Sequence, residues 1–276
     1  MAVTLRLRVR CHRRVRLHNP RVETLPLVLL VTLFAVAFVA GSVDAVAGGG
    51  GLLTLPALLL AQVPPVNALA TNKLQSSFGT FTSAWSMHRS GLTGSVRLAV
   101  PFACALVGSA AGTVLVQFVD ASALTVAVPV VLAVIAVYFI VMPRRDDVER
   151  PARIGSGVYY ATVVPTIGFY DGAIGPGTGS FYTAVGTSLR GHGLVAATAQ
   201  ARVLNFATNV ASLIVFAFSG KMLWLVGGVM AVGQVGGAYL GAWAVSRGGA
   251  RLIRPVVVVV CLAMLLQYLW RQGWLF

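Results

Sequence analysis

Four charged residues lie within long apolar stretches of the sequence. Asp44 and Asp171 each stand beside a glycine-rich segment, and Lys73 and Arg202 follow them in the same order. Inside a membrane an ionisable side chain costs several kcal/mol, so it usually faces a cavity, a transport path or a charge of opposite sign. The four residues are therefore candidates for binding an anion, for carrying a proton, or for pairing with one another.

The surroundings of the two aspartates repeat. Residues 41–51 read Gly-Ser-Val-Asp-Ala-Val-Ala-Gly-Gly-Gly-Gly, and residues 168–179 read Gly-Phe-Tyr-Asp-Gly-Ala-Ile-Gly-Pro-Gly-Thr-Gly. Asp44 thus matches Asp171. A glycine-rich break beside a carboxylate, present twice in apolar sequence, is typical of a secondary transporter whose site forms where broken helices of two repeats meet.

The glycines of both segments are candidate anion-binding groups. They leave backbone N–H groups uncovered at the start of a short helix, where the helix dipole is positive, so an oxyanion can rest there. The residues concerned are Gly48, Gly49, Gly50 and Gly51 in the first segment and Gly175, Gly177 and Gly179 in the second.

Each buried base begins a polar stripe on one helical face. When Lys73 is aligned with Arg202, the residues Ser76, Thr80 and Ser83 fall on Asn205, Asn209 and Ser212. Spacings of three and four residues put these side chains on the face that carries the cation. This arrangement predicts the lining of an anion path, with Ser76, Thr80, Asn205 and Asn209 as hydrogen-bonding groups.

The aspartates allow more than one role. Asp44 and Asp171 would pair with the two cations when the site is empty, or take protons that couple anion movement to the proton gradient. A purely structural interpretation stays open, in which each carboxylate caps a short helix or two Asp–Lys/Arg pairs merely lock helices together.

The composition predicts an all-α polytopic membrane protein. Of 276 residues, 57% are hydrophobic and 10% charged, and the mean hydropathy is +0.84. We expect an Arg-rich tail at 1–24, a first transmembrane repeat at 25–142, a charged connecting loop at 143–153 and a second repeat at 154–272.

Each of these two homologous halves is expected to hold about four full transmembrane helices and one short Gly-initiated re-entrant or broken helix. The first half has long runs at 25–43, 66–88, 97–119 and 121–142 and a short one at 52–62; the second has long runs at 154–170, 194–218, 222–246 and 252–270 and a short one at 180–189.

The membrane topology depends on the two short helices. At about 1.5 Å per residue they are too brief to span comfortably, which gives eight full spans and places the tail and the 144–153 loop together in the cytoplasm. We favour this arrangement because seven arginines in the tail are hard to translocate. The alternative is ten spans in two inverted repeats.

Other classes of site find no support in the sequence. The formal net charge of +14 comes mostly from the tail and short loops, where basic residues set topology, so no nucleic-acid partner is expected. Three widely spaced cysteines and four histidines show no ligand spacing, so we expect no metal and no cofactor. Neither a metal constellation nor a nucleophile beside a base is visible, which argues against an enzyme.

The stripes Gly108/Gly112 and Gly233/Gly237/Gly241 are interpreted as helix-packing faces.

Several motifs together resemble the TauE/SafE family of sulfite and sulfonate exporters, also called the 4-toluene sulfonate uptake permease family. They are Asp44-Ala-Val-Ala-Gly-Gly-Gly-Gly51, Leu55-Pro-Ala57, Pro64-Pro65, Ala68-Leu-Ala-Thr-Asn-Lys73 and Gly79, and the resemblance covers about 25–272. It implies a carrier of the bacterial cytoplasmic membrane, built by duplication, that moves small sulfur-containing or organic oxyanions. The second half departs from the first, with Arg202 in place of Lys73 and with Pro176 and Thr178 among its glycines.

The sequence as a whole predicts a secondary transporter that exports small anions such as sulfite or organosulfonates. An uncoupled anion channel and, less favoured, a membrane-embedded enzyme are the alternatives. The expected partners are a small anionic substrate and the lipid bilayer, with a homo-oligomer as a possible assembly.

Overall fold

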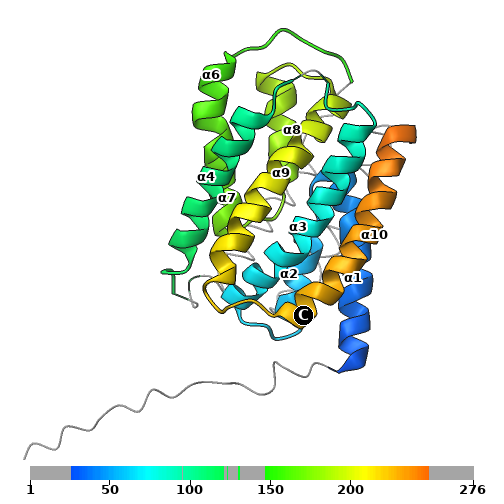
Figure 1. Cartoon of the computed structure of the whole chain (residues 1–276), viewed down its shortest axis with the longest axis vertical. Helices are drawn as coiled ribbons and strands as arrows, with labels where there is room; N and C mark the ends of the chain where they lie inside the picture. The colour runs from blue at the N-terminus through cyan, green and yellow to red at the C-terminus, as the bar shows by residue number, and fades with distance from the viewer. Residues whose placement is uncertain (1–25, 95, 121–122, 124–129, 131–146, 249–276) are drawn as a thin grey trace, which may run out of the picture.

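The first half of the chain folds into long helices interrupted by one short helix. The computed structural model describes residues 26–94, 96–120, 123, 130 and 147–248, and within this part the regular structure is helical throughout (Figure 1). The helices of the first half are α1 (Leu27–Ala47), α2 (Gly51–Leu60), α3 (Pro65–Arg89) and α4 (Ala99–Val116).

The second half follows the same order of elements. A first run holds α6 (Ser156–Val158), a π-helical turn η1 (Tyr159–Val163) and α7 (Val164–Ala173); after it come α8 (Thr178–Leu189), α9 (Leu194–Ala217) and α10 (Trp224–Gly248). The π-helical turn precedes Pro165, whose ring nitrogen has no N–H to donate to the usual helical acceptor. The expected helices at 121–142 and 252–270 lie outside the described residues.

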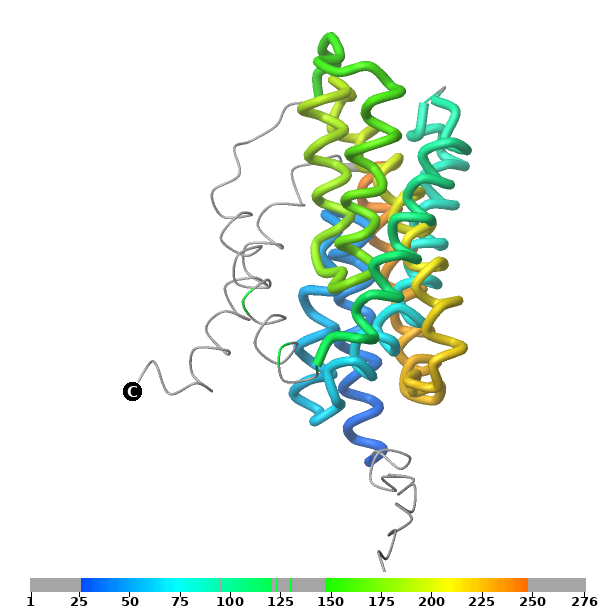
Figure 2. The backbone as a smooth tube through the Cα atoms, turned by 90° about the vertical axis from the view of Figure 1, so that its left-hand side faces the viewer, coloured from blue at the N-terminus to red at the C-terminus, as the bar shows by residue number. Residues whose placement is uncertain are grey.

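The two halves run in opposite directions. In Figure 1, α1 climbs from the lower end and the chain turns back at Gly48–Gly50 into α2, whereas α7 descends from the upper end and turns back into α8. Helix α3 then rises and α9 descends. Figure 2 likewise has the start of α1 and residues 147–155 at opposite ends of the bundle.

We predicted that the 1–24 tail and the 144–153 loop share one side of the membrane. The start of α1 and residues 147–153 lie at opposite ends of the bundle, and the tail itself is outside the described residues. Each short helix runs back toward the end of the bundle from which the preceding helix came. The next long helix, α3 or α9, therefore starts again from that end. The order of directions corresponds to inverted repeats, the alternative that the sequence left open.

Glycine permits the turn inside the bundle. Gly48 ends α1 with φ of 81°, and Gly175 follows α7 with φ of 96°. These left-handed conformations are unfavourable for residues that carry a Cβ. The chain therefore reverses within the protein interior, and the first turns of α2 and α8 begin there.

Equivalent helix pairs hold the two halves together through glycine. Helix α4 packs against α7, and α10 packs against α1. A Cβ at Gly112 would strike the Phe169 carbonyl and lie 3.0 Å from the Ala173 backbone nitrogen. On the other pair, a Cβ at Gly237 would strike the Phe38 carbonyl. The predicted packing role of both glycine stripes is thus confirmed, since only glycine allows these backbones to approach so closely.

The polar and the apolar helices of the bundle differ in the faces that they bury. Three described helices, Leu27–Ala47, Ala99–Val116 and Trp224–Arg247, are long and apolar enough to cross a membrane by length and composition. Helices α3 and α9 are as long but carry rows of buried polar side chains, and they contact each other. Their polar faces are hidden from lipid, which places the candidate site between them.

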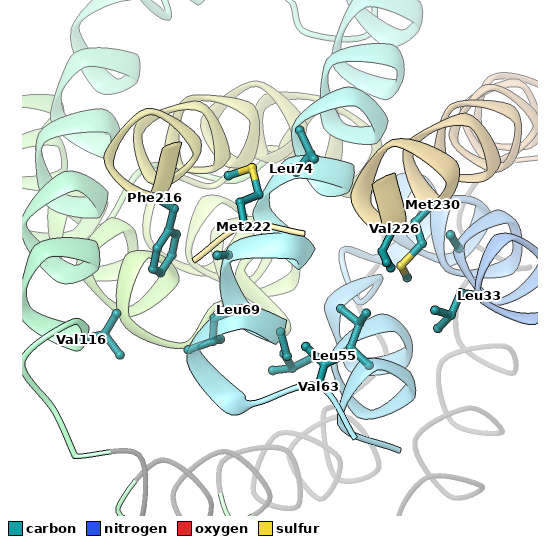
Figure 3. Close-up of a cluster of buried hydrophobic side chains, with 14 residues drawn as sticks. Leu33, Leu55, Val63, Leu69, Leu74, Val116, Phe216, Met222, Val226 and Met230 are labelled. Atoms are coloured by element: carbon teal, nitrogen blue, oxygen red, sulfur yellow. The ribbon is translucent and has the colours of Figure 1, made fainter. Parts of the chain in front are cut away.

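An apolar cluster closes the lower end of the bundle. Figure 3 shows its side chains arriving from α1, α2, α3, α4, α9 and α10. Leu55 and Leu58 of α2 are completely buried in it, together with Met230 of α10. Burial of this apolar surface fixes α2 against its neighbours on the side away from the glycine break.

A glycine substitution tests the close crossing of α4 and α7. Gly112→Ala should destabilise the protein by about 1–3 kcal/mol, because the new methyl group overlaps the α7 backbone and the helices must separate. Gly228→Ala is the matched control, since a Cβ there meets nothing within 4 Å. Thermal unfolding of the purified proteins in detergent measures the difference, and equal melting temperatures for the two variants would contradict the packing described.

Candidate functional site

A small pocket lies where the two glycine breaks meet α3 and α9. Its cavity volume is about 10 Å³, which is space for about one water molecule among the polar groups. The breaks, the first turns of α2 and α8, and the two central helices all contribute to its wall. The lining residues are Asp44, Gly48, Gly51, Asn72, Lys73, Ser76, Asp171, Gly175, Gly177, Thr178, Asn205 and Asn209.

Each buried acid pairs with the base of the other half. Lys73 Nζ lies 2.8 Å from Asp171 Oδ1, and Arg202 Nη1 lies 3.5 Å from Asp44 Oδ1. All four side chains are almost completely buried. Such charges are tolerated only when they are paired and hydrogen-bonded. The pairs therefore join the two repeats directly.

Both carboxylates also fix the start of the short helix that follows them. Asp44 Oδ1 accepts a hydrogen bond of 3.1 Å from the backbone N–H of Gly50, and Asp171 Oδ1 accepts one of 2.8 Å from Thr178 Oγ1. The capping and ion-pairing interpretations left open by the sequence thus both describe contacts in the structure. Each acid holds its own glycine break and the base of the opposite repeat.

Arg202 lies behind the pocket wall. Its guanidinium fits against Gly48 and Gly179, where a Cβ would collide with it, and Nη1 also donates to the Asp44 carbonyl. Nε and Nη2 are buried without a hydrogen-bond partner in the described part of the chain. Arg202 therefore holds the two breaks together at close range, whereas Lys73 borders the open space.

The structure brings most of the predicted site residues to one place. Gly48, Gly51, Lys73, Ser76, Gly175, Gly177, Asn205 and Asn209 line the pocket together with Asp44 and Asp171. Gly49, Gly50, Thr80, Gly179 and Arg202 are outside its lining. Among these, Gly50 donates to Asp44, and Thr80 donates its hydroxyl to the Ser76 carbonyl at 2.7 Å.

Two lining residues were not predicted. Thr178 stands among the second set of glycines, where its hydroxyl binds Asp171. Asn72 precedes Lys73, and its Oδ1 accepts from Thr54 Oγ1 and from Gln75 Nε2. These two donors orient the amide so that Nδ2 lies on the side of Gly51. Asn72 aligns with Ala201 of the second half, and Thr178 aligns with Gly51 of the first half. A search for similar residues at equivalent positions of the two halves therefore misses both.

No metal centre is evident in this region. Among the residues that the structure describes, no group of three His, Cys, Asp or Glu side chains is placed to hold a metal ion. Besides the carboxylates of Asp44 and Asp171, the polar groups of the pocket are amides, hydroxyls, backbone N–H groups and one ammonium, which are the usual ligands of oxyanions.

Comparison with known proteins identifies close sequence relatives. The family model for the sulfite exporter TauE/SafE matches residues 33–268. A probable membrane transporter protein, ORF9, of Sinorhizobium sp. is 41% identical over 87% of this chain and 92% of its own length. A probable membrane transporter protein of Haemophilus influenzae is 40% identical over 89% of this chain and 96% of its own length. The probable membrane transporter protein YfcA of Escherichia coli K12 is 41% identical over 86% of this chain and 88% of its own length. No solved structure gives a significant match.

A double-mutant cycle tests the pairing across the repeats. Lys73→Met alone should destabilise the protein by about 3–5 kcal/mol because it leaves the Asp171 carboxylate buried without its cation. Lys73→Met with Asp171→Leu should cost much less than the sum of the two single changes.

The control cycle combines Lys73→Met with Asp44→Leu, which removes one member of each pair. Its costs should be closer to additive, since both remaining charges stay unpaired. Unfolding of purified protein in detergent gives the four values of each cycle. Stronger coupling of Lys73 to Asp44 than to Asp171 would refute the pairing.

Proposed function

We propose a transport function for this chain, which belongs to the sulfite exporter TauE/SafE family. It is a multi-pass secondary transporter of the bacterial cytoplasmic membrane. It exports small anions, namely sulfite, organosulfonates or related sulfur oxyanions. The family match and three bacterial relatives named as membrane transporters support transport as its function. Long apolar helices around a polar centre support a membrane location.

The observation that carries the proposal is the pocket built jointly by the two repeats. Lys73 brings a cation to it, and the first residues of α2 and α8 bring helix N-termini, which carry partial positive charge. Asn205 Oδ1 already accepts from Asn209 Nδ2 at 3.2 Å, so the Asn205 amide has its NH2 group left to donate. A small oxyanion matches this set of donors.

Electroneutrality supports coupling of the anion to a proton. Asp44, Asp171, Lys73 and Arg202 carry formal charges that sum to zero, so one bound monoanion would leave a buried net negative charge. The anion also competes with Asp171 for the Lys73 ammonium. Asp171 Oδ2 is buried and has no hydrogen-bond partner in the described part of the chain, so it is an acceptor at which a proton can bind. A proton on Asp171 would free Lys73 for the anion and keep the site neutral.

With this coupling, the direction in which the anion moves depends on the sum of the anion gradient and the proton gradient. An anion that accumulates in the cytoplasm would leave together with a proton and restore the empty ion pair. The apolar cluster around Leu55 and Met230 argues against a continuously open channel, because it closes one end of the bundle. Alternating access at the interface of the two repeats fits the architecture.

Removal of the pocket cation tests the site. Lys73→Ala should abolish sulfite flux from proteoliposomes, because the anion loses its closest positive charge. Arg202→Ala should have the same effect by releasing both glycine breaks. Lys221→Ala is the control, since that lysine is exposed in the α9–α10 connection. Full flux in both Lys73→Ala and Arg202→Ala, at equal protein insertion, would remove the site assignment.

Neutralising the carboxylate tests the proton. Wild-type flux of the anion should rise as the pH falls on the side from which the anion is bound, since protonated Asp171 releases Lys73. Asp171→Asn should transport with little pH dependence and without moving protons, as measured with a pH-sensitive dye inside the vesicles. Unchanged proton movement in Asp171→Asn together with Asp44→Asn would rule out coupling through these carboxylates.

A further inference from the structure

The two central helices lie in equivalent surroundings. Helix α3 packs against α10, which is joined closely to α1, and α9 packs against α4, which is joined closely to α7. A Cβ at Gly168 of α7 would lie 2.6 Å from the Ala105 carbonyl oxygen of α4, and a Cβ at Gly41 of α1 would overlap the Gln234 carbonyl oxygen of α10. Ala105 aligns with Gln234 in the repeat. The contacts of α3 and those of α9 are therefore directly comparable.

Hydroxyl groups fasten α9 to α4 and α7. Ser109 Oγ of α4 donates to the Thr208 carbonyl of α9 at 2.7 Å and lies 2.8 Å from Ser212 Oγ. Thr113 Oγ1 of α4 is within hydrogen-bonding distance of the same Ser212 Oγ, at 2.8 Å, and of the Gly172 carbonyl of α7, at 3.2 Å. A buried hydrogen-bond network thus joins the three helices α4, α7 and α9.

The equivalent interface of α3 and α10 lacks these hydroxyl contacts. Two alanines of α10, Ala238 and Ala242, stand where α4 has its serine and threonine. Ser83 of α3, the counterpart of Ser212, donates to the Thr80 carbonyl of its own helix at 3.2 Å. The middle of α3 is therefore less firmly joined to its neighbour than the middle of α9.

Gln234 instead places a buried amide in this interface. Its side chain is 1% exposed, and among the residues that the structure describes Oε1 has no hydrogen-bond partner. The stem of the side chain lies directly on Gly79 of α3, because a Cβ at Gly79 would overlap Cγ of Gln234. A buried polar atom without a partner is costly inside a membrane protein, so this oxygen points to a second arrangement in which it is satisfied.

The beginning of α3 is fastened more firmly than its middle. Asn67 Nδ2 donates to the Lys221 carbonyl at 2.8 Å, and the Leu223 N–H donates to Thr71 Oγ1 at 3.2 Å. These contacts hold the connection before α10 against the first turns of α3, at the lower end of the bundle (Figure 1). A movement of α3 relative to α10 is therefore a tilt about this lower end.

A tilt of α3 would give the Gln234 amide a partner. Ser76 and Ser83 stand three residues before and four residues after Gly79, so they lie on the same face of the helix. Once Gly79 moves off the stem of Gln234, the amide can turn toward a hydroxyl one helical turn away. The lost packing at Gly79 is then offset by a new hydrogen bond, which is the property of an element with two stable positions.

The two buried ion pairs differ in the same sense as the two central helices. Lys73 of α3 is held by one ion pair, with Asp171. Arg202 of α9 is enclosed by the glycines of both breaks and donates to the Asp44 carbonyl in addition to its ion pair. The firmly fastened helix thus carries the enclosed cation, and the less fastened helix carries the cation that borders the pocket.

We propose that α3 is the moving one of the two central helices. Its upper part tilts between the position in the structure, in which Gln234 lies on Gly79, and a second position, in which the Gln234 amide oxygen accepts from a hydroxyl of α3. Helices α4, α7 and α9 stay together as one unit. The movement rests on the proposed transport function for its role, as the step that opens the central pocket, but the two positions are measurable without transport.

Distances between spin labels on two matched cysteine pairs test the proposal. The measurement uses the full-length purified protein with its three native cysteines replaced by serine. Trp85→Cys with Trp243→Cys places labels on α3 and α10. Ile214→Cys with Val114→Cys places labels at the aligned positions of α9 and α4. All four native side chains are exposed, so the labels leave the buried contacts intact.

The α3–α10 pair should give two distance populations and the α9–α4 pair only one. Gln234→Met keeps the length of the side chain but removes the acceptor, so it should reduce the second population about fivefold. Gly79→Ala should increase the second population, since its methyl group overlaps the Gln234 stem in the position seen in the structure. Because these two variants act in opposite directions, general loosening of the fold cannot produce both results.

A single population for the α3–α10 pair overturns the proposal, as do two populations in both pairs. A second population that Gln234→Met leaves unchanged also overturns it. Sulfite flux from proteoliposomes of the wild type separates this inference from the proposed function. If no anion moves but α3 has its two positions, the proposed transport fails and the movement of α3 stands. If the anion moves and the α3–α10 pair gives one distance, transport stands and the movement of α3 fails.

Discussion

The two buried ion pairs between the repeats are the interaction on which the rest of the structure depends. Each acid caps its own glycine break and reaches the base on the central helix of the other repeat. Four charges at this depth would be prohibitive if any were left alone. The opposite directions of the repeats bring each acid to the base of the other half, so one repeat by itself would leave both of its charges unpaired.

The pairs are related by the repeat but differ in what surrounds them. Lys73 and Asp171 border the open pocket at a separation of 2.8 Å. Arg202 is enclosed by the glycines of both breaks and is held additionally by the Asp44 carbonyl. A planar guanidinium with several donors suits this fixed position, and a flexible ammonium suits a partner that must change. In the proposed function, the Arg202 pair therefore holds the fold and the Lys73 pair exchanges its partner for the anion.

Much of the fold and part of the site followed from the sequence. The described helices lie close to the predicted ranges, because glycine breaks and apolar runs are local signals. Asp44, Lys73 and Asp171 were identified by the cost of burying charge in apolar sequence. The partner of each acid was not, since pairing across repeats depends on how the two halves pack.

The predicted topology was wrong because it gave the positive charges of the tail more weight than the path of the chain. Helix α2, residues 51–60, runs back toward the end of the bundle where α1 begins, and the sequence did not show this reversal. Arg202 was placed in the pocket by analogy with Lys73, although a bulkier group among glycines becomes part of the wall.

The central claim is that the pocket beside Lys73 binds an oxyanion. Thermal unfolding of the purified protein against sulfite, sulfate, thiosulfate, taurine, sulfoacetate and several carboxylates tests it most directly, since a ligand that binds only the folded state raises the melting temperature. The account predicts a selective rise with at least one sulfur oxyanion that disappears in Lys73→Ala. No rise with any anion of the panel, or a rise that Lys73→Ala retains in full, would contradict it.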